Sequence, residues 1–161
     1  MPDEILLLIV LVLPFLGSFL AALIPGSARR TGGWLTAGVA VIGLAISCAF
    51  YPGIADGAVV RAHWEWLPSL GLSFSLRMDG FAWMFAVLIT AIGLLVVLYA
   101  RYYMSPADPV PRFLSFLLGF MGAMLGVVLS GNLIQLVFFW ELTSLYSFLL
   151  IGYWYHNPKA R

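Results

Sequence analysis

The sequence predicts an all-α polytopic membrane protein with about five transmembrane helices and a short extracytoplasmic β-hairpin between the second and third helices. Hydrophobic residues make up 63% of the 161 residues and charged residues only 9%, whereas roughly 25% of the residues in soluble domains carry charge. Several apolar runs also approach the ~20 residues that a helix needs to cross a hydrocarbon core of ~30 Å. A lipid bilayer is therefore the expected environment of this chain.

Proline, glycine and charged residues divide the apolar sequence into five runs, and each run is long enough for a membrane helix. The predicted spans, within one membrane domain over residues 1–161, are residues 5–24, 34–50, 81–100, 113–129 and 133–155. Stripes of small residues on two runs predict close helix packing. These stripes are Ala37, Val41, Ala45 and Ala49 in the second run, and Ser115, Gly119, Gly122 and Gly126 in the fourth.

Residues 59–78 differ from the apolar runs, because apolar and polar side chains alternate there with a period of two. This period is typical of a half-buried strand, and the turn-forming residues 68–71 divide the segment into two halves. The sequence therefore predicts a β-hairpin outside the membrane, with His63 on its surface. Asp79 follows directly, and we expect its carboxylate to cap the first turn of the third helix.

The distribution of basic residues predicts the orientation of the chain in the cell membrane. In a five-span chain, six Lys and Arg residues fall on one side and two on the other, and the richer side is expected in the cytoplasm. The N-terminus and the hairpin are then outside, and the C-terminus is cytoplasmic. The six are Arg29, Arg30, Arg101, Arg112, Lys159 and Arg161, and the two are Arg61 and Arg77.

Composition and motifs argue against several classes of function. The formal net charge of +1 offers no basic patch for nucleic acid. Cys48 is the single cysteine of the sequence, so it forms no disulfide within the chain and supplies no cysteine cluster for a metal. Because no phosphate-binding glycine loop or Ser-His-Asp set occurs, we expect no cofactor, no metal and no enzyme active site.

Glu141 is the one charged residue between Phe113 and Tyr155, and it is the leading functional candidate. At 1.5 Å per residue from Asn132, it lies ~13 Å into a hydrocarbon layer of ~30 Å. An ionised carboxylate there costs at least ~2.5 kcal/mol on insertion scales for related charges. We therefore expect Glu141 to face the bundle interior, to pair with a cation or to take up a proton, and we predict that it carries protons.

Other polar residues of the fifth run are expected to support Glu141 or to pack. Ser144 lies within one turn of Glu141, and Trp140 beside it is expected to control hydration. The alternative for Glu141 is a static ion pair that holds helices in register. Three residues on the opposite side of the helix are expected to form interhelical hydrogen bonds, namely Asn132, Gln135 and Thr143.

The run Leu136–Trp154, which contains Trp-Glu-Leu-Thr-Ser at residues 140–144, resembles the fifth helix of the A subunit of the Mrp-type multisubunit Na⁺/H⁺ antiporters. Residues 76–81, 99–104 and 155–161 resemble segments of the same family in the same order. That family is homologous to the antiporter-like membrane subunits of respiratory complex I. In those subunits Gly usually follows the Trp-Glu pair, so Leu142-Thr143-Ser144 favours the Mrp family.

The resemblance implies a function and a set of partners. Glu141 matches the family's key carboxylate, which pairs with a lysine on a later helix, and family members are much longer than this chain. Residues 1–161 thus resemble an N-terminal portion that acts with other antiporter subunits in a hetero-oligomer, in the lipid bilayer, on Na⁺ and H⁺. The alternatives are a proton-pumping membrane subunit of NADH:quinone oxidoreductase and a passive membrane scaffold.

Overall fold

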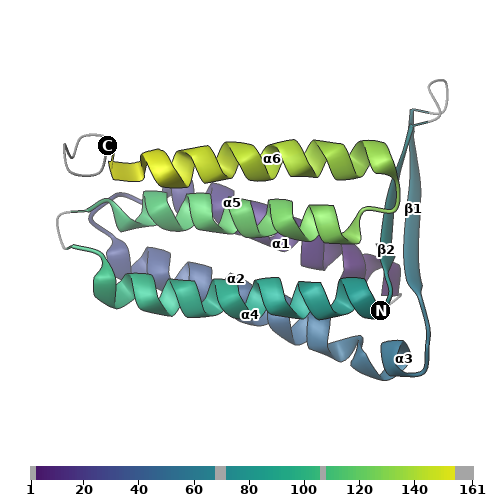
Figure 1. The fold of residues 1–161 in the computed structure, drawn as a ribbon. Coiled ribbons are helices and arrows are strands. Elements are labelled where there is room, and N and C mark those ends of the chain that lie inside the picture. Colours follow the sequence, from purple (N-terminus) through teal and green to yellow (C-terminus); the bar gives the residue numbers. More distant parts are fainter. Residues whose placement is uncertain (1–2, 68–71, 106–107, 155–161) are drawn as a thin grey trace.

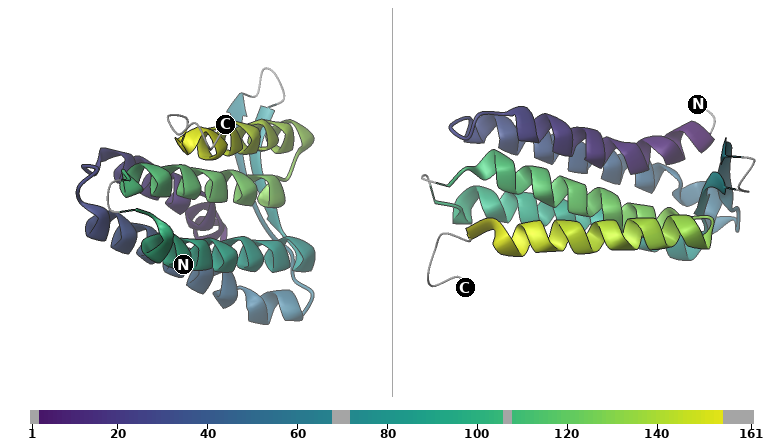
Figure 2. Two further views of the ribbon diagram at one scale, coloured as in Figure 1. Left: turned by 60° about the vertical axis from the view of Figure 1, so that its left-hand side comes forward. Right: turned by 90° about the horizontal axis from the view of Figure 1, so that it is seen from above.

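The computed structural model describes residues 3–67, 72–105 and 108–154, and within these ranges five long helices lie side by side (Figures 1 and 2). All five are long and apolar enough to cross a bilayer. A two-stranded hairpin crosses one end of the bundle, so the predicted fold class is confirmed. The long helices are α1 (Asp3–Leu23), α2 (Arg29–Ala49), α4 (Gly80–Tyr103), α5 (Val110–Leu129) and α6 (Leu133–Ile151).

The helix boundaries differ from the predicted spans by up to three residues in α1, α4 and α5, and by more in α2 and α6. Helix α2 begins at Arg29 rather than at residue 34, because an arginine can extend its charged end to water while its backbone continues the helix. A short helix, α3 (Tyr51–Ala55), was not predicted, and Pro52 lies in its first turn, where the missing amide of proline removes no intrahelical hydrogen bond. Helix α6 ends in a 3-10 turn, η2 (Gly152–Trp154), and residue 155 lies outside the described residues.

The hairpin consists of β1 (Val60–Leu67) and β2 (Leu72–Met78), paired antiparallel with an irregularity between Glu65 and Leu67. Its turn lies outside the described residues. Ala62 and Leu76, opposite each other in the register, are buried against the bundle, and their neighbours Arg61, His63 and Arg77 are exposed. His63 is exposed on β1, so the predicted alternation and surface position are confirmed.

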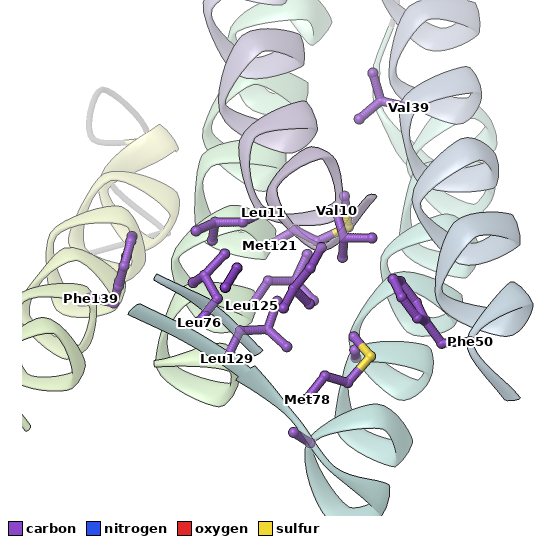
Figure 3. Close-up of a cluster of buried hydrophobic side chains, with 14 of the residues drawn as sticks. Val10, Leu11, Val39, Phe50, Leu76, Met78, Met121, Leu125, Leu129 and Phe139 are labelled. Atoms are coloured by element: carbon purple, nitrogen blue, oxygen red, sulfur yellow. The ribbon is translucent and has the colours of Figure 1, made fainter. Parts of the chain in front are cut away.

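The largest hydrophobic core lies where the hairpin meets the helices (Figure 3). Leu11 of α1 and Leu125 of α5 are at most 1% exposed there, and Leu76 and Met78 of β2 close the same cluster from the end of the bundle. The hairpin is therefore part of the core of the protein. Because it is held by buried apolar side chains, it fixes the positions of the helix ends beneath it.

Helix α5 is the centre of the bundle and packs against α1, α2, α4 and α6. Its small residues allow large side chains to approach the backbone. A Cβ atom at Gly119 would overlap the ring of Tyr146, and one at Gly126 would overlap Phe139, both from α6. The packing predicted for this stripe is confirmed, and it is how α6 attaches to the bundle.

The other part of the α5 stripe faces α1. The Ser18 hydroxyl donates to the Ser115 carbonyl oxygen at 2.8 Å, and the Ser115 hydroxyl donates to the Ser18 carbonyl oxygen, also at 2.8 Å. Two turns further along α5, Gly122 faces the ring of Phe15. These reciprocal hydrogen bonds satisfy two buried hydroxyls where no water is available.

The stripe predicted on α2 does not pack against the described helices, because Val41 and Ala45 are exposed. The buried face carries Thr36, Gly43 and Ser47 instead. Both hydroxyls of this face donate to carbonyl oxygens one turn earlier in α2, at 2.8 Å, so their burial leaves no unpaired group. Small residues occur on both faces of this helix, and their spacing alone does not indicate which face packs.

Successive long helices run in opposite directions, so the loops gather at two ends (Figure 1). The hairpin end carries β1, β2 and the first residues of α1, α4 and α6. We call the opposite end the arginine end, because its described residues include Arg29, Arg30, Arg101 and Arg112. Lys159 and Arg161, which were predicted on the same side, lie outside the described residues.

Candidate functional site

Helix α6, which carries Glu141, is anchored at its first turn. The Asn132 side-chain oxygen accepts a hydrogen bond from the Gln135 amide at 2.8 Å, as an N-cap does, and its nitrogen donates to the Ser73 carbonyl oxygen at 2.9 Å. The backbone amide of Ser75 donates to the Gln135 side-chain oxygen at 3.0 Å. The first turn of α6 is thereby tied to strand β2.

These contacts correct the prediction of interhelical hydrogen bonds on this side of α6. Asn132 and Gln135 bond to a strand, and the Thr143 hydroxyl bonds to the Trp140 carbonyl oxygen of its own helix. The sequence indicates only which residues share a face. Because the hairpin crosses the end of the bundle, a strand occupies the position where a helix was expected.

One face of α6 packs on α5, and the opposite face is open. Gln135 and Phe139 are the buried residues of α6. The open face, which we call the outer stripe, is mostly apolar, and Glu141 lies at its middle. The outer stripe consists of Ile134, Val137, Phe138, Glu141, Ser144, Leu145, Phe148 and Ile151.

The structure brings the three predicted site residues together on this side of α6. Glu141 and Ser144 are exposed on adjacent turns, and Trp140 is 60% exposed beside them. Within the described part of the chain, no cation and no hydrogen-bond donor contacts the Glu141 carboxylate. The described helices thus place Glu141 on the surface of their bundle, and the expected interior position requires protein beyond α1–α5.

The physical reason is the position of α6 at the edge of the bundle, where it packs chiefly on α5 (Figure 2). A hydropathy pattern identifies a membrane helix without indicating how many neighbours surround it. An ionised carboxylate facing hydrocarbon is unfavourable, and such groups almost always face a bundle interior or a water-filled cavity. Of the residues in the outer stripe, Glu141 is therefore the one that lipid would solvate least well.

Asp79 has the structural role that was predicted for it. Its carboxylate accepts a hydrogen bond from the Ala82 amide at 2.9 Å and lies 2.9 Å from the Arg77 guanidinium. The Ala82 hydrogen bond, with Arg77 contributing, holds the pKa of Asp79 below its ordinary value although partial burial opposes this. Asp79 is therefore an N-cap for α4.

A cavity of about 490 Å³, which was not predicted from the sequence, lies between the hairpin and α6. Trp64, Phe74 and Phe138 line it, and Gln135 beside them has a buried side-chain nitrogen without a hydrogen-bond partner. A strand and a helix that are far apart in sequence form this cavity, so no local pattern indicates it. The described residues contain no group of three or more His, Cys, Asp or Glu side chains that would hold a metal ion.

Comparisons with known proteins assign the family. Residues 64–114 match the family described as NADH-ubiquinone oxidoreductase (complex I), chain 5 N-terminus, and residues 130–161 match the family described as NADH:quinone oxidoreductase/Mrp antiporter, TM. The second match contains Glu141 and the whole outer stripe. The class of protein is thus a multi-pass membrane subunit of the proton-antiporter type.

Individual relatives narrow this class. A relative from Rhizobium meliloti (strain 1021), named as the probable A/B subunit of a K⁺/H⁺ antiporter, is 55% identical over 98% of this chain and 16% of the relative. The A subunit of the Na⁺/H⁺ antiporter from Alkalihalophilus pseudofirmus (strain ATCC BAA-2126 / JCM 17055 / OF4) is 44% identical over 91% of this chain and 18% of the relative. The structure of the Mrp complex from Dietzia sp. DQ12-45-1b matches 96% of this chain and 16% of its own, with a TM-score of 0.76 and 27% identity.

The chain belongs to the family of Mrp-type antiporter A subunits and matches the N-terminal portion of such a protein. The resemblance drawn from the helix around Glu141 is therefore confirmed. The chain spans less than one fifth of the length of these relatives.

Proposed function

We propose that this chain is part of a multisubunit monovalent cation/H⁺ antiporter, in which Glu141 is the carboxylate that binds and releases the transported proton. In this proposal it belongs to a transporter and not to an enzyme. The single observation that carries the proposal is an acidic side chain in the middle of an apolar membrane helix, on a face that no described helix covers. Membership of the antiporter family supports it.

The chemistry follows from the energetics of a carboxylate in a membrane. Desolvation favours the protonated form of Glu141, whereas a nearby cation favours the ionised form. A change in hydration or in the position of a cation therefore moves the proton on or off. Ser144 offers a hydroxyl on the adjacent turn, and the Trp140 ring limits the access of water.

The cover of the outer stripe is part of the proposal. The relatives are more than five times as long as this chain, and we propose that further helices and other antiporter subunits supply the missing neighbours. A cation on one of them would form the partner of Glu141. The hetero-oligomer then places Glu141 in an interior that neither lipid nor bulk water reaches freely.

The orientation of the chain completes the proposal. The arginine end faces the cytoplasm, and the N-terminus and hairpin face the outside of the cell membrane, because basic loops are retained in the cytoplasm. Of the described Lys and Arg residues, Arg61 and Arg77 lie on the hairpin and four lie at the arginine end. Labelling of a cysteine placed at His63 by an impermeant reagent in intact cells tests this orientation.

Na⁺ is the coupling ion that we propose first, because the A. pseudofirmus relative is named as part of a Na⁺/H⁺ antiporter. The name of the R. meliloti relative, at 55% identity, makes K⁺ the second candidate. Exchange measured with each ion at equal concentration separates them. A rate with K⁺ at least as high as that with Na⁺ would overturn the first assignment.

The decisive experiment replaces Glu141 in the assembled antiporter and measures cation-driven proton movement in everted membrane vesicles with a pH-sensitive dye. We expect Glu141→Gln to reduce exchange to background and Glu141→Asp to retain part of it, because aspartate keeps a titratable carboxyl one methylene shorter. Glu65→Gln, at an exposed acid on β1, is the matched control and should exchange normally.

Two other outcomes would favour the alternative functions. Full exchange by Glu141→Gln at normal expression would indicate a passive scaffold. Proton pumping driven by NADH oxidation, with co-purifying oxidoreductase subunits, would indicate a component of complex I, the alternative that the match of residues 64–114 keeps open.

A further inference from the structure

A second cavity, of about 290 Å³, opens at the arginine end between α2, α4 and α5. Three arginines surround it, Arg29 and Arg30 from the first turn of α2 and Arg101 from the last turn of α4. Between them the wall is apolar, with Val97 and Leu114 nearly fully buried. We call this cavity the arginine pocket. It lies at the opposite end of the bundle from the cavity between the hairpin and α6.

The residues that line the arginine pocket include three arginines and no acid. No carboxylate in the described part of the chain lies within ion-pair distance of the three guanidinium groups. Arg29 donates to the Met104 carbonyl oxygen at 2.8 Å, and Arg101 lies over the Trp34 ring, 5.4 Å from its centroid. Arg30 is exposed and has no such contact. The pocket therefore holds two oriented guanidinium groups and one free group.

The N-terminus of helix α2 adds to the positive electrostatic potential of the arginine pocket. Its first turn contains no acidic residue, and its N-cap residue Ala28 provides no side-chain hydrogen bond. The amides at a helix N-terminus carry partial positive charge and favour an anion. This contribution has the same sign as the three arginines.

Exposed aromatic rings place the pocket at the depth of lipid headgroups. Trp34 is 61% exposed, and Tyr99, Tyr102 and Tyr103 are 61% to 85% exposed around the last turns of α4. Trp and Tyr gather at membrane–water interfaces, because their rings combine an apolar body with a polar end. The pocket thus opens where phosphate groups of the bilayer are concentrated.

We propose that the arginine pocket binds the headgroup of an anionic phospholipid, with its phosphodiester among the three arginines and an acyl chain leaving over the apolar wall. Arginine suits this role because its planar fork donates two hydrogen bonds to a phosphate group. Basic pockets between membrane helices are suited to such headgroups. A soluble phosphate would use the arginines but would leave the apolar wall without a partner, so we assign the site to a lipid.

The test measures lipid bound to the protein purified in its complex and placed in phosphatidylcholine nanodiscs, with spin-labelled phosphatidylglycerol as the probe. We expect Arg30→Gln combined with Arg101→Gln to lower the affinity for the probe by about tenfold to thirtyfold. Each arginine near the membrane surface contributes a similar free energy to the binding of an anionic lipid, which corresponds to about fivefold in affinity. Arg112→Gln is the matched control. It removes an exposed arginine at the same end that lies over the Phe116 ring and does not line the pocket.

The single variant Arg30→Gln removes no contact within the described residues, so we expect it to fold normally. It should lower the affinity for the probe by about fivefold. Inorganic phosphate is added as a competitor, and spin-labelled phosphatidylcholine reports selectivity. Unchanged affinity in both variants, equal loss in Arg112→Gln, or displacement of the lipid by millimolar phosphate would each overturn the proposal.

Discussion

Helices α5 and α6 are apolar helices of nearly equal length, 20 and 19 residues, yet their surroundings differ. Twelve residues of α5 are buried and only two of α6. Helix α5 uses glycines to receive side chains from both sides, whereas α6 contributes large rings to one side only. The difference shows that α5 has all its neighbours within this part of the protein. Helix α6, which carries Glu141, has a face that no described helix covers.

The attachment of α6 to α5 gives the largest expected effect on stability. Gly126→Leu places a side chain where the Phe139 ring lies, and overpacking of this kind costs about 1–3 kcal/mol. We expect thermal unfolding of the purified protein in detergent, followed by circular dichroism, to occur at a lower temperature. Proteolysis should also become faster near α6.

The matched control for this substitution is Gly38→Leu in α2, because no atom lies within 4 Å of a Cβ built at Gly38. Leucine favours a helix more than glycine by about 1 kcal/mol, so this variant should be as stable as the wild type or more stable. Equal destabilisation by both substitutions would indicate that the contact between α5 and α6 is not what holds α6.

A smaller effect is expected at the N-caps of α4 and α6, and it distinguishes a charged cap from a neutral one. Asp79→Ala and Asn132→Ala should each cost about 1 kcal/mol at neutral pH. The native pKa of Asp79 is lowered, so its contribution is fully present above the unfolded value of about 3.9 and declines as the pH falls through the native pKa. The cost of Asn132→Ala should not change with pH.

Unfolding of both variants in urea between pH 3 and pH 7 measures this prediction. Asp79→Asn is the control, since it keeps an oxygen acceptor for the Ala82 amide and removes the charge. If the cost of Asp79→Ala stayed constant down to pH 3, the carboxylate charge would make no contribution to the cap.

The smallest effect is expected between α5 and α1. Ser18→Ala, Ser115→Ala and the double variant form a double-mutant cycle across the reciprocal hydrogen bonds. Hydrogen bonds between membrane helices average about 0.6 kcal/mol in such cycles, and we expect a coupling energy of that size. A coupling near zero would mean that close packing alone holds α5 against α1.

Much of the fold was predictable from the sequence, because the signals are local. Runs of apolar residues indicate the membrane helices, and a period of two indicates the hairpin. The cap at Asp79 follows from a carboxylate directly before a helix. The start of α2 and the short α3 were not predicted, since an apolar run does not indicate helical residues that lie outside it in polar surroundings.

The candidate site was predictable in part. The sequence identifies Glu141 as the acid within an apolar helix and places Ser144 on the adjacent turn. It does not indicate that Asn132 and Gln135 bond to a strand, since that contact joins residues about 60 positions apart. The arginine pocket was not predicted either, because its arginines come from two helices that are distant in sequence.

The sequence by itself determined that this is a membrane protein with one acid deep within a helix, because the cost of placing polar groups in hydrocarbon restricts each segment separately. Only the tertiary structure decided which face of α6 remains open, which small-residue face of α2 is buried and where the arginines meet. These features depend on contacts between distant segments, and the periodicity of a helix leaves the choice of neighbour open.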